Sequence, residues 1–183
     1  EILRKIKDNR LSIENGYEQI IHSVTGELGF ADVDVARSLR TGFPEVIFCL
    51  NKEDDDILKI ARAIREKNNL VLLTRAREST YGLLKDHFEN VEYYSRSGAI
   101  TIGAIEEEKG LVSIVTAGTS DIPVAEEAYV TAKSMGAKVV SFWDIGVAGI
   151  HRLFSKLEKL KKSKVIIAVA GMDGALPGVI AGL

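Results

Sequence analysis

The alternation of apolar and polar positions divides the chain into two parts that differ in regularity. In the first part, apolar residues at helical spacing predict a helix over residues 12–24, with Ser12 as its N-cap. An acidic run, which we interpret as a solvated first turn, opens a second helix near residue 53. The elements predicted after residue 44 are strands at 45–50, 70–74, 91–94 and 99–102, and helices at 53–67 and 79–87.

Beyond a charged segment at residues 106–110, which we interpret as a linker, the pattern becomes more regular. Apolar strands at 111–116, 137–143 and 164–170 alternate with helices at 122–135 and 148–162. The third of these strands is apolar on both faces, which is typical of a central parallel strand. A βαβαβ order with right-handed crossovers predicts a parallel sheet covered by helices.

We therefore predict an α/β protein with two domains. Residues 1–105 form a small N-terminal α/β domain. Residues 106–183 form a partial flavodoxin/Rossmann-like three-layer domain with a parallel sheet.

Composition narrows the class of protein. The chain has 183 residues, of which 46% are hydrophobic and 27% charged, and its formal net charge is −2. This balance gives no electrostatic footprint for nucleic acid, and no apolar run approaches the roughly 18 residues of a membrane span. The charged first residues do not fit a signal peptide. A single cysteine, Cys49, excludes an internal disulfide and fits a reducing cytoplasm, where we expect the protein to reside.

The candidate chemistry lies in three glycine-containing turns that follow the strands of the second domain, at residues 117–121, 144–152 and 171–178. Ligands of open parallel sheets bind at this edge, where helix N-termini offer free N–H groups. The turns contain neither the dinucleotide fingerprint nor the phosphate loop with its lysine. The predicted substrate- and phosphate-binding residues here are Gly118, Thr119, Ser120, Asp121, Arg152, Gly171 and Gly174.

Individual side chains suit particular roles in such a site. Thr119 and Ser120 offer hydroxyl donors to a phosphate, and Asp121 suits a ribose hydroxyl or Mg²⁺; the alternative is that Ser120 or Asp121 simply caps the helix. His151 beside Asp144 suits proton transfer, the alternative being a structural histidine. The guanidinium of the adjacent Arg152 suits bidentate binding of an anionic group.

Three further residues fall in the first domain. Arg37 and Arg40 belong to a charged run that is either solvated or able to reach an anionic ligand. Cys49 lies in an apolar strand without an adjacent base, so we interpret it as an inert core thiol.

The turns resemble those of a known family. Residues 118–128, 144–153 and 169–177 are similar to motifs of the pyridinium-3,5-biscarboxylic acid mononucleotide synthases, which begin nickel-pincer nucleotide biosynthesis for lactate racemase. Residues 34–48 resemble the N-terminal signature of that family. The second domain also resembles phosphoribosylaminoimidazole carboxylase, whose phosphate loop ends as Ser120, Asp121 and Pro123 do, and whose catalytic motif corresponds to His151-Arg152.

The resemblance implies carboxylation of nicotinic acid adenine dinucleotide at C5 of its pyridine ring with CO₂ or bicarbonate. Hydrolysis of the phosphoanhydride with Mg²⁺ then releases AMP. Catalytic roles fall on Asp144, His151 and Asp173, and Asp121 or Asp144 could hold Mg²⁺. The second histidine of the purine enzyme's Ala-His-Leu-Pro-Gly loop is absent, because residues 174–178 read Gly-Ala-Leu-Pro-Gly. This absence disfavours the purine reaction.

Three expectations concern the whole protein. In the family a cysteine thiolate adds to the pyridinium ring; Cys49 does not match it, and we expect that cysteine, with the rest of the domain, beyond Leu183. We expect a homo-oligomer, a tetramer or octamer, that acts on a nucleotide and binds neither nucleic acid nor membrane. The alternatives to the pyridinium reaction are a phosphoribosylaminoimidazole carboxylase or N5-carboxyaminoimidazole ribonucleotide mutase, and a non-catalytic nucleotide-binding module.

Overall fold

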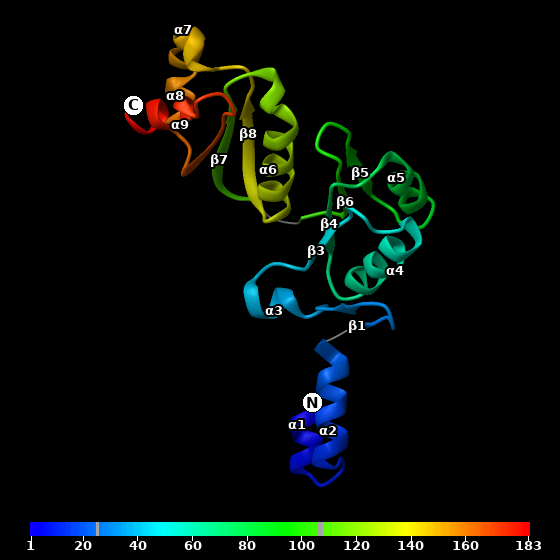
Figure 1. The fold of residues 1–183 in the computed structure, drawn as a ribbon. Helices are drawn as coiled ribbons and strands as arrows, with labels where there is room; N and C mark the ends of the chain where they lie inside the picture. The colour runs from blue at the N-terminus through cyan, green and yellow to red at the C-terminus, as the bar shows by residue number, and fades with distance from the viewer. Residues whose placement is uncertain (25, 106–107) are drawn as a thin grey trace.

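A shared helix, α6 (Ile122–Ser134), lies between two β-sheets in the computed structural model (Figure 1). The structure describes residues 1–24, 26–105 and 108–183. Over these ranges the strands form a two-stranded ladder, a four-stranded sheet and a three-stranded sheet. Mixed α/β architecture with parallel strands confirms the predicted fold class.

The N-terminal elements begin with a helical hairpin and lead into the four-stranded sheet. They are α1 (Ile2–Lys7), α2 (Ile13–Val24), β1 (Gly26–Glu27), β2 (Asp32–Val33), α3 (Arg37–Thr41), β3 (Val46–Phe48), α4 (Asp54–Arg65), β4 (Leu70–Thr74), α5 (Glu78–Lys85), β5 (Val91–Tyr94) and β6 (Ala99–Gly103). The sheet has the order β3-β4-β6-β5; β3 and β4 are parallel, and the other pairs are antiparallel. Helix α4 supplies Ile57 and Ile64 to its core.

The C-terminal elements form the three-stranded sheet with helices on both faces. They are β7 (Lys109–Thr116), the 3₁₀ turn η1 (Thr119–Asp121), α6, β8 (Ala137–Phe142), the 3₁₀ turn η2 (Val147–Gly149), α7 (Ile150–Phe154), α8 (Leu157–Leu160), β9 (Val165–Val169) and α9 (Ala175–Ala181). All pairings are parallel, and the order is β8-β7-β9. Leu153, Leu160 and Leu176 bring α7, α8 and α9 into one apolar cluster, on the face opposite α6 (Figure 1).

Some predicted elements differ from the structure. The helix predicted at 148–162 is broken into α7 and α8, because the Ser155 hydroxyl donates to the Arg152 carbonyl and the backbone N–H of Lys156 donates to Leu153 in a tight turn. The strand predicted to be central, now β9, lies at the edge of the described sheet, and β7 is central. Residues 37–41, for which we predicted no helix or strand, form α3.

The predicted linker at 106–110 is also shorter than expected. Strand β7 already begins at Lys109, with a bulge before Leu111. Glu106 and Glu107 lie outside the described residues. The four-stranded sheet ends at Gly103, and we propose the division at residues 105/106 on that ground.

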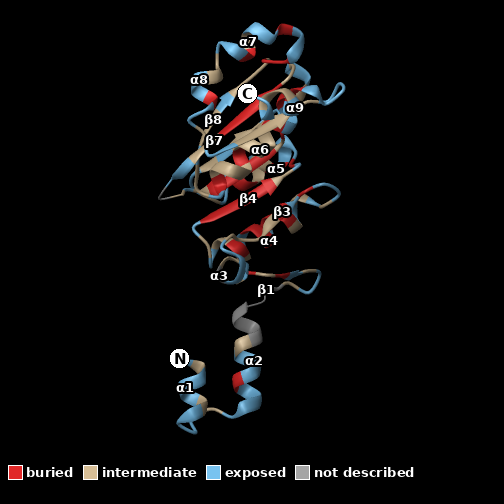
Figure 2. Ribbon diagram, turned by 90° about the vertical axis from the view of Figure 1, so that its left-hand side faces the viewer, coloured by how far each residue is buried: buried red, intermediate tan, exposed pale blue. Residues whose placement is uncertain are grey.

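Helix α6 joins the two halves through apolar and polar contacts. Val130 packs with Leu72 and Ala99 of the four-stranded sheet. The backbone N–H of Ser97 donates to Glu126 at 2.8 Å, and the Arg75 guanidinium lies 2.9 Å from the Glu127 carboxylate. Figure 2 shows buried residues along β4 and β7, and helices α4 and α6 also contribute buried residues. In the described ranges no helix is long and apolar enough to cross a membrane.

The acidic run at the start of α4 is only partly solvated, contrary to expectation. Asp54 accepts hydrogen bonds from the Thr80 hydroxyl at 2.6 Å and from Arg77 at 3.1 Å, which ties α4 to α5. Partial burial acts to raise the pKa of Asp54, but the hydrogen bonds from Thr80, Ser79 and Arg77 outweigh it and lower the pKa below its usual value.

We predict that Asp54→Asn lowers the free energy of unfolding at pH 7 by about 1 kcal/mol, because the amide accepts these bonds more weakly than the carboxylate. The lowered pKa means that the carboxylate stabilises the fold above about pH 3.9 and loses this effect as the pH falls through the folded-state value. Urea unfolding at pH 7 and at pH 3 should therefore show a gap between the parent and the variant that narrows in acid. The exposed neighbour Asp55→Asn is the matched control, and an equal loss in both variants would contradict the prediction.

Candidate functional site

The carboxyl edge of the three-stranded sheet has the geometry of a ligand-binding crevice. The chain leaves β7 for β8 on one side, and after β8 it crosses to β9 on the other side. The turns after β7 and β9 therefore diverge, which is the switch point at which open α/β sheets bind ligands. In Figure 1 the three predicted turns lie together at the upper end of this sheet.

Asp121 joins the turns on the two sides of the switch point. One carboxylate oxygen accepts the backbone N–H of Gly118 at 2.8 Å, and the other accepts that of Gly171 at 3.0 Å. Asp121 occupies the N-cap position of α6, but its side chain makes no capping bond to that helix; it accepts the Gly118 N–H at the start of η1 instead. Its role toward phosphate, ribose or Mg²⁺ stays a prediction; the structure gives it a backbone-bridging role.

The turn after β8 is organised by an ion pair. The Arg152 guanidinium donates to the Asp144 carboxylate, and Asp144 has left-handed backbone, with φ of 57°. The Arg152 side chain folds back over Gly149, where a Cβ atom would lie 2.5 Å from its Nε atom, so a larger residue at position 149 would displace the guanidinium. Both members of the pair are partly exposed, which makes its contribution to stability small and leaves it open to a ligand.

Thr116 is a residue of the site that sequence reasoning missed. It is the last residue of β7 and is buried; its hydroxyl accepts the backbone N–H of Asp144 at 2.8 Å, and its carbonyl accepts that of Ile145. On the other side, the N–H of Ala117 donates to Val169 at 3.0 Å. The end of β7 therefore holds both neighbouring turns. A hydroxyl residue at the end of an apolar strand, just before a glycine turn, was the available signal.

The remaining candidates of this edge face solvent. Thr119 and Ser120 are exposed on η1, and His151 is exposed on the first turn of α7. Asp173 and Gly174 are exposed in consecutive left-handed conformations after β9. Within the described ranges, the side chains of Ser120, His151 and Asp173 form no hydrogen bond or ion pair, so their polar atoms are free for a ligand.

The structure does not bring Arg37 and Arg40 to this edge within one chain. Both lie on α3, which Figures 1 and 2 place at the far end of the sheets from the three turns. Arg40 donates to the Asp34 carboxylate at 2.6 Å, and Glu45 accepts the backbone N–H of Asp34 at 2.6 Å. This local network accounts for the density of charge in the run.

Cys49 has the properties of the inert thiol that the sequence predicted. It is buried, and its Sγ lies 3.7 Å from the Ile47 carbonyl. Burial raises the pKa of the thiol to about 12, so the thiolate is nearly absent at neutral pH. It is unsuited to nucleophilic attack.

The residues proposed for Mg²⁺ do not form a ready ligand set. Across the described ranges, no group of three or more histidine, cysteine, aspartate or glutamate side chains lies close enough to hold a metal. Asp121 already accepts two backbone N–H groups, and Asp144 pairs with Arg152. The use of Mg²⁺ stays a prediction, and we assign no step to it.

Comparisons with known proteins match both parts of the chain. Residues 25–104 match the LarB/PurE-like N-terminal domain, and residues 111–183 match AIR carboxylase. An uncharacterized protein of Methanocaldococcus jannaschii is 37% identical over 194 aligned residues, which cover 100% of this chain and 76% of that protein. The N5-carboxyaminoimidazole ribonucleotide mutase of the same organism is 34% identical over 76 residues, which cover 40% of this chain and 46% of that enzyme.

The two domain matches follow each other in the order of the two sheets, and the first relative aligns along the whole chain. The chain therefore belongs to the family that joins a LarB/PurE-like N-terminal domain to an AIR carboxylase domain.

Proposed function

We propose that this protein carboxylates the pyridine ring of nicotinic acid adenine dinucleotide at C5 and hydrolyses the phosphoanhydride to release AMP. The domain matches support a carboxylase- or mutase-related function. The choice of a pyridinium substrate rests on the motifs that the chain shares with the pyridinium-3,5-biscarboxylic acid mononucleotide synthases. In the overall reaction CO₂ replaces the C5 proton, and water cleaves the phosphoanhydride.

The observation that carries this choice is the side chain at position 175. In the similar loop of the purine carboxylases a histidine occupies this place, whereas here Ala175 begins α9 and is exposed at the carboxyl edge. A methyl group cannot transfer a proton. The following Leu176 is buried in the apolar cluster, so the loop keeps its anchor while its titratable group is missing.

The free polar groups of the edge suit an anionic nucleotide. The hydroxyls of Thr119 and Ser120 precede α6, whose positive dipole end favours a phosphate. Arg152 uses only part of its fork of five N–H donors on Asp144, so the guanidinium can also bind an anionic group. The imidazole of His151, exposed beside this pair, is the proposed proton carrier.

A second candidate is the mutase reaction on N5-carboxyaminoimidazole ribonucleotide. The identity of 34% over 76 residues to the Methanocaldococcus jannaschii mutase favours it. That similarity covers only 40% of the chain, whereas the match to the LarB/PurE-like N-terminal domain covers residues 25–104, which include the four-stranded sheet.

We predict that the complete gene product, incubated with nicotinic acid adenine dinucleotide and bicarbonate, releases AMP together with a dicarboxylated pyridinium mononucleotide. Chromatography with mass detection and ¹³C-bicarbonate measures both products. Turnover of N5-carboxyaminoimidazole ribonucleotide without AMP release would instead establish the second candidate. Nucleotide binding without any turnover would leave a binding module.

Cys49 serves as an internal control in this assay. Because the thiol is buried and its pKa is raised to about 12, Cys49→Ala should keep the parent rate within about twofold. A loss of AMP release in a folded Cys49→Ala protein would assign the nucleophile to Cys49 and overturn our interpretation of that residue.

We predict that Arg152→Gln lowers kcat/KM about 100-fold, mainly through KM, because removal of a charged contact to a substrate anion costs about 2.7 kcal/mol. Initial rates over a range of substrate concentrations measure the effect. Lys159→Gln removes an exposed charge from the neighbouring helix α8 and is the matched control. An unchanged KM in Arg152→Gln would restrict Arg152 to its structural pairing with Asp144.

A further inference from the structure

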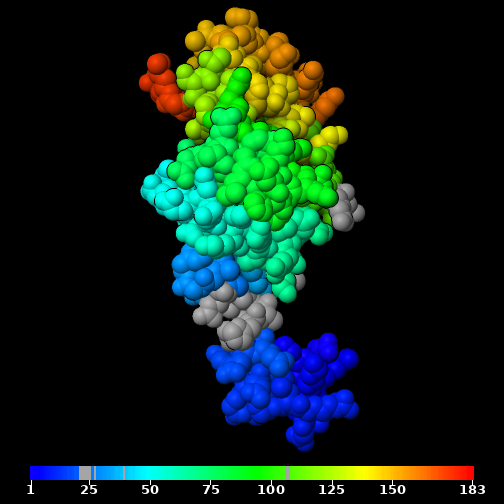
Figure 3. Space-filling model, turned by 90° about the vertical axis from the view of Figure 1, so that its right-hand side faces the viewer, coloured from blue at the N-terminus to red at the C-terminus, as the bar shows by residue number. Residues whose placement is uncertain are grey.

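The helical hairpin of α1 and α2 stands clear of both sheets. Its contacts run mainly between its own two helices and otherwise reach β1. Figures 1 and 3 show it as a separate lobe at one end of the molecule. The helices are 6 and 12 residues long, and helices this short are marginal in water without tertiary packing. Packing against a further surface would therefore stabilise the hairpin.

The inner seam of the hairpin is tightly packed around a glycine. A Cβ atom at Gly16 would lie 2.3 Å from Cδ1 of Ile6 and 3.6 Å from the Leu11 side chain. The two helices approach closely here because Gly16 has no side chain. This contact fixes which faces of α1 and α2 turn outward.

An apolar face lies to one side of this seam and remains open. Leu3, Ile13 and Tyr17 are 71%, 72% and 66% exposed. Leu3 precedes Ile6 by three positions, and Ile13 precedes Gly16 by three. At 3.6 residues per turn both side chains are turned by the same angle from the seam, which places them on the same side of an antiparallel hairpin. Tyr17 follows Ile13 by four positions and shares its face.

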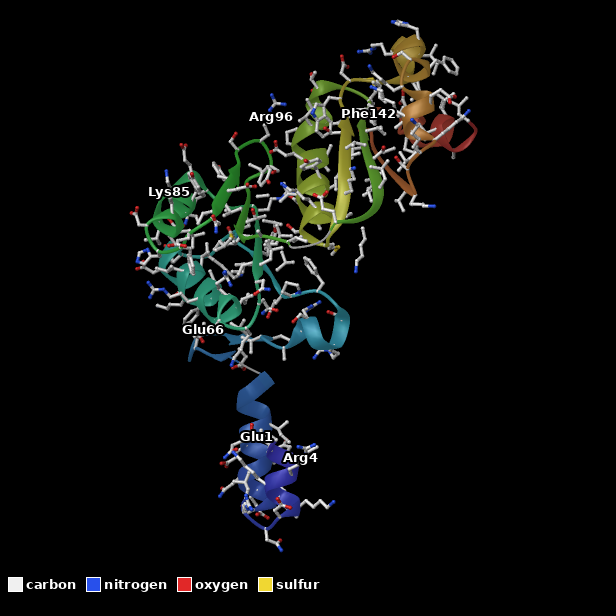
Figure 4. The ribbon with its side chains drawn as sticks, turned by 180° about the vertical axis from the view of Figure 1, so that it is seen from behind. Glu1, Arg4, Glu66, Lys85, Arg96 and Phe142 are labelled. Atoms are coloured by element: carbon white, nitrogen blue, oxygen red, sulfur yellow. The ribbon has the colours of Figure 1, made fainter. Side chains whose placement is uncertain are left out.

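The charges of the two helices are opposite. Helix α1 carries Arg4, Lys5 and Lys7 and has no acidic residue in its first turn, whereas α2 carries Glu14 and Glu18. In the described part of the chain, Arg4, Lys7, Glu14 and Glu18 form no ion pair with another residue. Figure 4 shows the Arg4 side chain extending from α1 into open space.

We propose that this hairpin docks face to face with the hairpin of a second copy of the chain and forms an antiparallel four-helix bundle. A two-fold axis along the helices would set α1 of each copy against α2 of the other, so that the basic helix meets the acidic helix twice. This docking would also bury Leu3, Ile13 and Tyr17 of both copies. A hairpin with one basic helix, one acidic helix and an apolar face is self-complementary, which is the requirement for an isologous interface.

Charge reversal in the full chain tests the pairing of helices. One variant carries Arg4→Glu with Lys7→Glu, so that both helices are acidic; the other carries Glu14→Lys with Glu18→Lys, so that both are basic. Sedimentation equilibrium at low salt should show each variant associating about tenfold more weakly than the parent, because like charges then face each other. Lys67→Glu with Lys162→Glu makes the same charge change as the first variant at exposed sites elsewhere and should leave the association unchanged.

The decisive measurement is the mixture of the two reversed variants. In a mixed pair each acidic helix faces a basic helix, so association should be restored. The association constant of the mixture should lie within about threefold of the parent's value. This recovery cannot arise from assembly through another surface or from an unfolded hairpin. If either variant keeps the parent's mass, or if the mixture stays as dissociated as its components, the proposal is overturned.

Discussion

The burial of α6 on two sides is the constraint on which the rest of the structure depends. Ala125 and Val130 are both completely buried, although they are five positions apart in the sequence and therefore lie about 140° apart around the helix. The helix contacts β7 and β8 on one side and β4 and β6 on the other. Burial contributes about 1.5–3 kcal/mol for a valine such as Val130 and about 0.8 kcal/mol for the single methyl group of Ala125, so neither sheet can shift without losing part of this packing.

This constraint reaches the candidate site because α6 begins where the site begins. The turn η1 leads directly into α6, and its last residue, Asp121, holds the backbone of Gly118 and Gly171. The ion pair of Arg75 with Glu127 and the bond from Ser97 to Glu126 fix the first turns of α6 from the other sheet. The N-terminal domain therefore supports the switch-point edge through α6, without placing Arg37 or Arg40 there.

The hairpin has a much smaller apolar core than the two sheets. Its core is one seam of small and aliphatic residues around Gly16, too small to order two short helices alone. Each sheet, in contrast, contains a strand with a run of four buried residues, β4 in one and β7 in the other. The two sheets and their helices thus form a well-packed body. The hairpin exposes an apolar face and helices of opposite charge, which would complement the same surfaces of a second copy.

The sequence by itself determined most of the secondary structure and the edge where the candidate site lies, because apolar periodicity, Pro123 and the glycine turns act over a few neighbouring residues. It also determined the inert character of Cys49, since an apolar strand predicts burial. The sequence did not predict the break between α7 and α8. The Ser155 hydroxyl bonds to the Arg152 carbonyl only once the turn has formed.

Only the tertiary structure decided which groups meet. Asp121 reaches Gly171 across 50 residues because β7 and β9 pair in parallel, and Thr116 reaches Asp144 because β7 is the central strand. The strand order β8-β7-β9 depends on the direction of each crossover, which no local pattern records. The sequence supplies the side chains, and the packing of sheets on α6 sets their distances.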